Sequence, residues 1–417
     1  MALPPLQTNK PMDGLTRRTL LRASGVAGAA AVLAGAAGVT LEEVFRRARE
    51  TPLPGGTPVL VLLTMYGGND GLNTVVPYSD PAYHDARPGL AYQASEVLRL
   101  DDHFGLNPGM KGLAKMWQDK QVAIIRGVGY PKPDRSHFRS MDIWQTASPE
   151  SPVNSGWIGR WLDVAGDDPL LALNIGEVLP PLAVGTKATA AALSLGAATR
   201  SGATLPSLAA LGQPDPSDGP AAKLVVASYA AQQRVQQTFA PVLADRASGA
   251  KPADQGGGRT SLKDQLDLVA RCIKAGAPPR VYAVSATGFD THAEEKAAQT
   301  AQLTMVDAAL TEFRTSMAGH ARARDVVVLA YSEFGRRVAA NASQGTDHGT
   351  AGPSFVIGDR VKAGFYGDEP SLTDLVAGDL KTSTDFRTVY AELLDRVLGA
   401  DPSRVLDKPG TPLGFMA

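Results

Sequence analysis

The side chains that could carry chemistry recur just after stretches that predict strands. The candidates are Asp70, Ser136 with His137, Asp290 with His292, Glu333, and Asp347 with His348. Carboxylates and imidazoles gathered from several strand ends are what a composite metal site requires. Mixed oxygen and nitrogen ligation suits zinc, manganese or iron, whereas an all-oxygen subset suits magnesium or calcium. The sequence therefore predicts a divalent-metal site without deciding the metal.

Each candidate also has an ordinary structural explanation. Asp70 lies in a glycine-rich turn, where a carboxylate often serves the turn alone. A histidine taken singly is more often a hydrogen-bonded structural residue than a ligand. For His292 and His348 the shared position after strands favours the ligand role. The remaining histidines outside these motifs are predicted to lie on the surface: His84, His103 and His320.

Strands and helices alternate along the predicted chain. Residues 59–65 form a nearly unbroken apolar run, which is typical of a strand buried on both faces. Further strands are predicted in QVAIIRGVG, RVYAVSATGF, DVVVLAY and PSFVIG, with helical spacing between most of them. This order predicts an α/β fold with a doubly wound, mainly parallel sheet and helices on both faces. Ligands bind at the carboxyl ends of such strands, so Asp70, Asp290, His292 and His348 are expected to converge.

The N-terminus predicts an export signal. Arg17 and Arg18 precede an Ala- and Gly-rich apolar segment, and residues 34–36 fit a small-residue cleavage site. The paired arginines and weak hydrophobicity favour the twin-arginine (Tat) route, which carries folded proteins to the periplasm or outside the cell. An uncleaved membrane helix is the alternative, although the segment is short and glycine-rich for a stable transmembrane anchor.

Composition sets the predicted domain plan. Residues 1–36 would be the signal peptide, 37–57 a helical spacer, and 58–417 the α/β domain. Residues 183–258, rich in Ala, Gly, Ser and Pro, predict a small cap-like insertion.

The 41 basic and 42 acidic residues nearly balance, which gives no electrostatic case for nucleic acid as a partner. The single cysteine, Cys272, excludes intramolecular disulfides and thiolate metal clusters, and its setting predicts a buried helix face.

Several motifs resemble a bacterial family catalogued as domain of unknown function 1501. They are GGNDGLNTVVPY, PKPDRSHFRSMDIWQTA, GFDTH, SEFGRR and DHGTAG, together with the twin-arginine leader and the DFRTVYAELL ending. The resemblance covers most of residues 58–400. That family looks like a branch of the alkaline phosphatase and sulfatase superfamily, whose members hydrolyse phosphate or sulfate esters at a two-metal site. The resemblance implies an alkaline phosphatase-like fold and an ester substrate, either a small molecule or a glycan.

By this likeness, Asp70 corresponds to the first metal-binding aspartate and Ser136, at a helix N-terminus, to the nucleophile. Asp290, His292 and His348 resemble further metal ligands. Where the superfamily usually has an Asp-His pair, this chain has Ser332-Glu333, so one histidine ligand is missing. Asp347 could replace it, or the site could hold one metal or none.

Two functions are therefore expected. The first is a secreted metal-dependent hydrolase of phosphate or sulfate esters, with Ser136 as nucleophile facing the site in preference to His137. Its predicted metal ligands are Asp70, Asp290, His292, Glu333, Asp347 and His348, and its predicted substrate-binding residues are Asn69, Arg135, His137 and Arg336. The alternative is a non-catalytic exported binding or cell-surface assembly protein that keeps the fold with a degenerate metal site.

Overall fold

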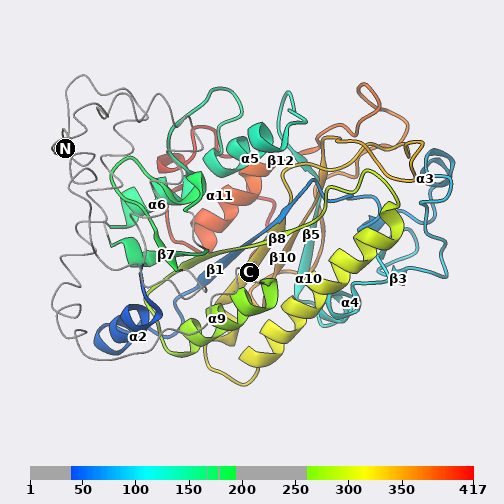
Figure 1. The fold of residues 1–417 in the computed structure, drawn as a ribbon. Coiled ribbons are helices and arrows are strands. Elements are labelled where there is room, and N and C mark those ends of the chain that lie inside the picture. Colours follow the sequence, from blue (N-terminus) through cyan, green and yellow to red (C-terminus); the bar gives the residue numbers. More distant parts are fainter. Residues whose placement is uncertain (1–38, 167, 177–178, 194–260) are drawn as a thin grey trace, which may run out of the picture.

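The structure is a computed structural model that describes residues 39–166, 168–176, 179–193 and 261–417 (Figure 1). The predicted export signal and most of the predicted insertion, including its expected long helix, lie outside these residues. Among the described residues, we find no helix that combines the length and apolar character needed to cross a bilayer.

One large sheet runs through the described part of the molecule. Its strands, from edge to edge, are β11 (Gly364–Tyr366), β5 (Val122–Gly129), β10 (Gly352–Ile357), β9 (Val326–Tyr331), β1 (Val59–Tyr66), β8 (Val281–Thr287), β6 (Ala172–Ile175) and β7 (Ala191–Leu193), with β12 (Thr384–Asp385) also paired to β5. Only β10 pairs antiparallel with its neighbours in this sheet, so the other strands point the same way. The prediction of a mainly parallel sheet is confirmed.

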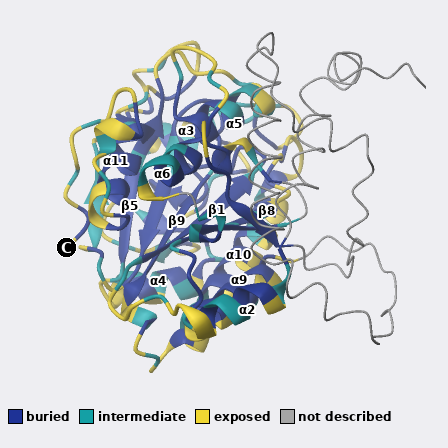
Figure 2. Ribbon diagram, turned by 90° about the vertical axis from the view of Figure 1, so that its left-hand side faces the viewer, coloured by how far each residue is buried: buried dark blue, intermediate teal, exposed yellow. Residues whose placement is uncertain are grey.

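Strand β1 explains why the apolar run is continuous. Val61 and Leu63 enter the core on one face of the sheet, whereas Leu60 and Leu62 enter the core on the other. Because side chains alternate across a strand, a strand covered on both faces needs apolar residues at every position. Burial of these four residues is nearly complete, and Figure 2 shows the buried core on both sides of the sheet.

Helices cover both faces, as the sequence predicts (Figure 1). One face is packed by α2 (Leu41–Glu50), α4 (Lys111–Gln118), α9 (Leu262–Lys274) and α10 (Glu295–Met317). The other face is packed by α5 (His137–Thr146), α6 (Trp157–Ala165) and α11 (Phe386–Arg396). Outside these layers, α3 (Pro81–Ala86) lies near a small sheet of β2 (Val75–Val76), β4 (Gly105–Leu106) and β3 (Leu98–Arg99). Cys272 is buried in α9, as predicted.

Two segments next to the predicted domain boundaries pack into the main fold. The spacer helix forms as α2, with a capping box between Thr40 and Glu43, but it packs into the core through Val44 and Ala48. The first residues of the predicted insertion form β7, which pairs with β6 in the main sheet. The sequence missed β7 because its alanine-rich composition carries little strand signal.

Candidate metal centre

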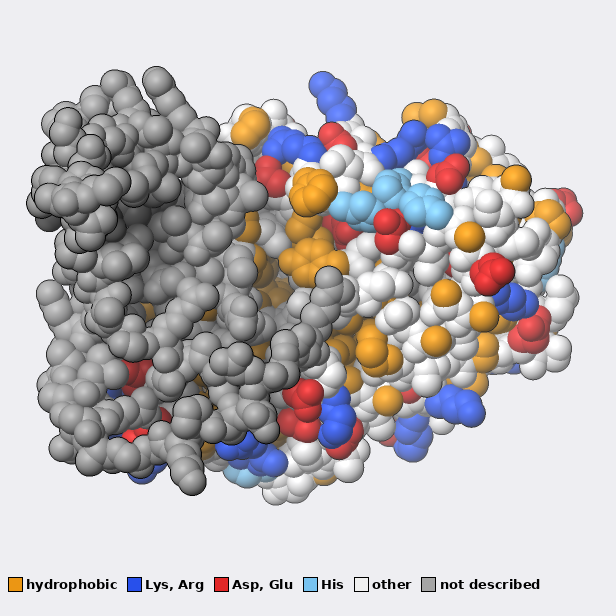
Figure 3. Space-filling view, viewed as in Figure 1, with side chains coloured by type: hydrophobic (Ala, Val, Ile, Leu, Met, Phe, Trp, Pro, Cys, Tyr) orange, Lys and Arg blue, Asp and Glu red, His pale blue; other side chains and the backbone are white. Residues whose placement is uncertain are grey.

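Four side chains meet at the carboxyl ends of the parallel strands: His137, Asp290, His292 and His348. His348 Nε2 lies 3.0 Å from the Nε2 atoms of both His137 and His292. Asp290 Oδ1 lies 2.9, 3.1 and 3.4 Å from the Nε2 atoms of His292, His348 and His137. We call this group the histidine–aspartate cluster. Figure 3 shows histidine side chains gathered on one face of the molecule with acidic side chains among them.

The cluster residues come from separate segments of the chain that meet at one edge of the sheet. His137 begins α5 after β5, Asp290 and His292 follow β8, and His348 lies between β9 and β10. The turn after β1 allows these loops to approach. Gly67 has φ of +121°, and a Cβ there would lie only 2.5 Å from the Asp290 backbone nitrogen. Glycine is therefore required where the β8 loop crosses the end of β1.

Hydrogen bonds fix which ring nitrogens face inward. His348 Nδ1 lies 2.8 Å from the carbonyl oxygen of Arg135, and His137 Nδ1 lies 2.7 Å from Glu333 Oε1. Because a carbonyl and a carboxylate only accept hydrogen bonds, both Nδ1 atoms must carry the proton. In the neutral rings both Nε2 atoms then present lone pairs to each other and to Asp290 Oδ1. Such a group of acceptors needs a cation, either a proton or a metal, at its centre.

The spacing of the cluster fits a metal. A tetrahedral zinc ion with bonds of about 2.0–2.1 Å keeps its ligand atoms about 3.3 Å apart. Among His137, Asp290 and His348, the three distances between ligand atoms range from 3.0 to 3.4 Å. The side chains are about one quarter to one half exposed, which leaves the centre accessible. His292 contacts His348 and Asp290 but does not belong to the three-residue group of His137, Asp290 and His348 that could hold a metal.

Glu333 contacts the cluster through the ring of His137. Its Oε1 accepts from Gly67 N (2.9 Å) as well as contacting His137, and its Oε2 accepts from Ser332 Oγ (2.9 Å). Burial opposes ionisation, but these hydrogen bonds keep the pKa of Glu333 below its ordinary value. The hydrogen bond that His137 donates to Glu333 in turn raises the pKa of His137. A carboxylate behind a ligating histidine fixes the ring and its tautomer, so Glu333 is placed as an orienting residue and not as the direct ligand that the sequence predicted.

Arg336 holds Asp290 in place. Arg336 is buried, and its Nη2 lies 2.7 Å from Asp290 Oδ1. Its remaining N–H groups donate to backbone carbonyls of Gly67, Gly68, Phe289 and Thr346. Although burial opposes it, the bond from Arg336 leads the effects that lower the pKa of Asp290 to about 2. Because these N–H groups already donate within the protein, the guanidinium of Arg336 is not available for the substrate-binding role that the sequence predicted.

Asp70 lies apart from the cluster, contrary to the sequence prediction. It is fully buried and forms a two-pronged ion pair with Arg87, including a bond of 2.9 Å from Nη2 to Oδ1. Leu72 N also donates to Oδ1 (3.2 Å). Both carboxylate oxygens are therefore engaged, which corrects the expected ligand role. Arg87 follows α3, and nothing in its sequence setting marked it as the partner of Asp70.

Glu295 completes this second group, which we call the buried ion-pair group: Asp70, Arg87 and Glu295. Glu295 begins α10, is fully buried, and accepts from Thr346 Oγ1 (2.6 Å). Burial first, and then the negative charge of Asp70, raise the pKa of Glu295 to about 9. Its carboxyl is consequently protonated near neutral pH and can donate to Asp70. The sequence analysis missed Glu295 because it lies within a helix and not after a strand.

Ser136 and His137 do not lie where the sequence analysis expected them. His137, not Ser136, enters the cluster. Ser136 is the exposed N-cap residue of α5, where its backbone N–H bonds to Asp134 Oδ1 (2.8 Å) and its hydroxyl makes no capping hydrogen bond. The sequence could place both residues at the start of the helix but could not fix the rotation of the first turn. Phe334, which packs against the rings of His137 and His348, was also missed although it directly follows Glu333.

The other predicted residues occupy the surroundings. Arg135 contributes its carbonyl to His348 and pairs its side chain with Asp379. Asp347 is exposed, with Oδ1 3.7 Å from His292 Nδ1, and lies outside hydrogen-bond distance. Asn69 is buried, and its amide bonds to Thr74 and Gln299. That inward position does not support the substrate-binding role predicted for Asn69.

The described region is thus an α/β protein with a candidate single-metal centre at its strand ends. The sequence model described as "Protein of unknown function (DUF1501)" matches residues 185–411, more than half of the chain. The chain belongs to this family. No curated protein sequence matches it significantly.

Three solved structures with a similar arrangement show what the fold resembles. A protein of that superfamily from Vibrio parahaemolyticus has 11% identity and a TM-score of 0.42, covering 89% of this chain and 79% of the other. The lipoteichoic acid synthase LtaP from Listeria monocytogenes has 9% identity and a TM-score of 0.38, with coverage of 88% and 80%. The C-terminal periplasmic domain of EcEptC from Escherichia coli, solved in complex with zinc, has 9% identity and a TM-score of 0.35, with coverage of 72% and 73%.

Proposed function

We propose that the chain is an exported, divalent-metal-dependent hydrolase of phosphate or sulfate esters. The observation that carries the proposal is the convergence of two imidazoles and one carboxylate, those of His137, His348 and Asp290, whose ligand atoms lie 3.0 to 3.4 Å apart. A bound divalent ion would polarise the ester oxygen and lower the pKa of an attacking hydroxyl. The nitrogen-rich donor set favours zinc over magnesium or calcium, which prefer oxygen ligands.

His137, Asp290 and His348 would hold the ion, with His292 next to them. The described residues contain one such group, which supports a site for one metal in place of the two-metal site that the family resemblance implied. Glu333 keeps the proton of His137 on Nδ1, and the Arg135 carbonyl does the same for His348. These contacts leave Nε2 of both rings directed to the ion.

Ser136 is the proposed nucleophile. Its hydroxyl is exposed, makes no capping hydrogen bond, and directly precedes the cluster residue His137. The free N–H groups of the first turn of α5 favour negative charge near this position. Arg135 supports binding of the anionic ester because its side chain is about two fifths exposed at the start of the same helix. One of its terminal nitrogens pairs with Asp379, and the other guanidinium nitrogens have no partner among the described residues.

Assays with p-nitrophenyl phosphate and p-nitrophenyl sulfate in added zinc, manganese, magnesium or calcium test this function. We expect wild-type hydrolysis with at least one metal and loss of that activity in Ser136→Ala without a loss of stability. Ser261→Ala is the matched control, because Ser261 caps α9 through its side chain. That variant should lose about 1 kcal/mol of stability and keep its activity. Absence of wild-type activity with every metal would favour the non-catalytic binding protein.

Export by the twin-arginine route is part of the proposal and concerns residues outside the described structure. The paired arginines of a Tat leader are read as an address by the export machinery. Replacing Arg17 and Arg18 together by lysine should therefore retain the protein in the cytoplasm, as measured by cell fractionation. Normal appearance of the double variant outside the cytoplasm would contradict this route.

A further inference from the structure

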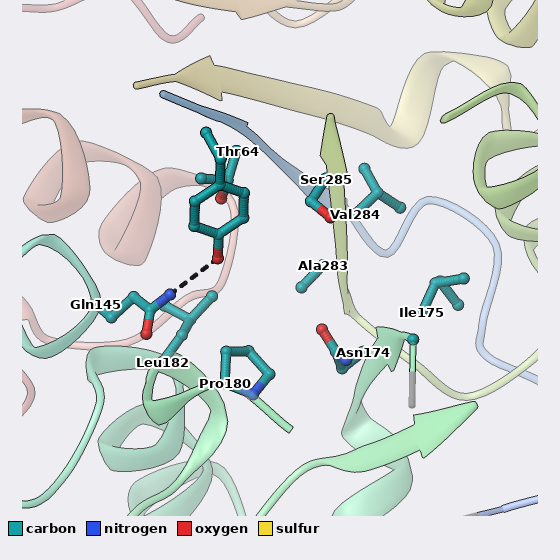
Figure 4. A pocket seen from close by; sticks show the side chains of 11 residues that line it. Thr64, Gln145, Asn174, Ile175, Pro180, Leu182, Ala283, Val284 and Ser285 are labelled. Atoms are coloured by element: carbon teal, nitrogen blue, oxygen red, sulfur yellow. Dashed lines mark hydrogen bonds between the residues drawn. The ribbon is translucent and has the colours of Figure 1, made fainter. Parts of the chain in front are cut away.

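A cavity of about 280 Å³ lies at the same edge of the sheet as the histidine–aspartate cluster (Figure 4). Its walls come from the ends of β1, β6 and β8, from α5, and from the segment around Leu182. At roughly 30 Å³ per water molecule in the liquid, this space equals about nine waters. A six-membered ring with its substituents is of this size.

The residues of the cavity lining that the structure describes carry no formal charge. None of the described residues that line it is Asp, Glu, Lys, Arg or His. Tyr66 is the titratable residue of the lining, and burial, assisted by Tyr331 and Glu333, raises its pKa and keeps the phenol neutral. A charged ligand group would lose its hydration here without gaining a counter-charge. The cavity therefore favours a neutral ligand.

The lining is nevertheless polar on several sides. Gln145 is buried and donates from Nε2 to Tyr66 Oη (3.1 Å). Figure 4 shows Gln145 on one side of the cavity, with Ser285 near the strand ends; Asn174, on the other side, already has a partner within the chain. A wholly apolar ligand would cover polar groups such as the Ser285 hydroxyl without offering them a hydrogen bond. Neutral hydroxyl groups can replace them.

Apolar surfaces alternate with these polar groups. Pro180 and Leu182 form one wall of the cavity, and Ala283 lies in the strand that crosses it. A ligand with a rim of hydroxyl groups and faces of C–H groups meets both kinds of surface. A pyranose ring has this combination, whereas a flat apolar ring or a phosphate group does not.

We propose that this cavity is a binding site for a neutral pyranose unit of the substrate. Its link to catalysis rests on the proposed function. Helix α5 carries His137 at its first position and Gln145 eight residues later, which corresponds to about 12 Å along the helix. A substrate that reaches both places is longer than one sugar unit, so the ester hydrolysed at the cluster belongs to an oligosaccharide or another extended glycoside.

Saturation-transfer NMR on the full-length protein tests the binding directly. The probes are methyl α-glucopyranoside, methyl β-galactopyranoside and N-acetylglucosamine, with glucuronate as the charged counterpart of glucose. We expect transfer to at least one neutral pyranoside and weaker binding of glucuronate. Failure of every neutral probe to bind, or preferential binding of glucuronate, would overturn the proposal.

Two variants locate the binding. Gln145→Met keeps the length of the side chain but removes its amide, and Ala283→Leu fills the floor without removing a polar group. Each should weaken binding by about tenfold or more, which corresponds to about one lost hydrogen bond or its steric equivalent. Gln121→Met is the matched control, because Gln121 precedes β5 at the opposite end of the sheet. Unchanged binding in both cavity variants would overturn the assignment.

A third variant separates this proposal from the proposed function. His348→Ala removes a cluster residue and leaves the lining of the cavity intact. Pyranoside binding that persists in His348→Ala supports the cavity as an independent subsite, whether or not ester hydrolysis is detected. Loss of pyranoside binding in a folded His348→Ala protein would place the sugar at the cluster and overturn the cavity site.

Discussion

Two groups of charged side chains follow the parallel strands, and their carboxylates are neutralised in different ways. The buried ion-pair group is closed, because the fully buried Asp70 receives both prongs of an equally buried Arg87. The histidine–aspartate cluster is open, because Asp290 is about half exposed and faces three imidazole nitrogens. Of these two groups, only the histidine–aspartate cluster has more hydrogen-bond acceptors than hydrogen-bond donors. The difference separates a structural ion pair from a site that requires an external cation.

The number of donors explains this difference. Asp70 is matched by a cation from within the chain, and Glu295 can add a proton of its own. In the cluster, Arg336 contacts Asp290 but does not contribute a donor to the three inward-facing Nε2 atoms. A carboxylate after a strand is therefore a candidate ligand only when no buried arginine already satisfies it.

The largest expected effect comes from breaking the closed group. Arg87→Met would leave the carboxylate of Asp70 buried without its partner, which typically destabilises a protein by about 3–5 kcal/mol. Urea unfolding should show a loss of this size. Lys115→Met is the matched control, because the exposed pair between Lys115 and Asp119 should contribute at most about 1 kcal/mol. A loss in Arg87→Met no larger than that of the control would contradict the structural role of the pair.

A smaller effect concerns pH. The pKa of Glu295 is raised from 4.5 to about 9, so between these values the folded protein holds a proton that the unfolded chain has released. The contribution of Glu295 to stability is complete below pH 4.5 and is lost as pH rises toward 9. Glu295→Gln removes this titration.

Urea unfolding at several pH values measures the difference between wild type and Glu295→Gln. Relative to wild type, the variant should become steadily more stable as pH rises through this interval. Glu96→Gln is the control, because Glu96 is exposed and its pKa is lowered. A constant difference between wild type and Glu295→Gln across the interval would show that Glu295 is not held protonated.

The sequence could predict which strand ends bear the cluster but not every side chain that enters it. Asp290, His292 and His348 were expected to meet because each follows a strand of a parallel sheet. His137 was assigned to substrate and Ser136 to the site, because the rotation of the first turn of α5 depends on tertiary contacts such as that of His137 with Glu333. That contact also gives Glu333 its orienting role.

The closed group lay beyond sequence reasoning for a different reason. Asp70 follows β1 in the position expected of a ligand, and its partner Arg87 lies in a loop whose path has no periodic signal. Its position is fixed by contacts distant in the sequence, because Arg87 also donates to the carbonyl oxygens of Val338 and Arg337. The same limit applies to Arg336, whose sequence suggested a free anion-binding fork but whose donors are engaged by the turn after β1.

Zinc titration of the metal-stripped protein by calorimetry is the most direct test of the central claim that the cluster needs a cation. We expect one zinc ion per chain in wild type, loss of this binding in His348→Ala, and binding about 10–100-fold weaker in Glu333→Gln, which loses the orienting carboxylate. His320→Ala, outside the cluster, should bind zinc as wild type does. Absence of zinc binding to the wild-type protein, or equal binding by folded His348→Ala, would contradict the account.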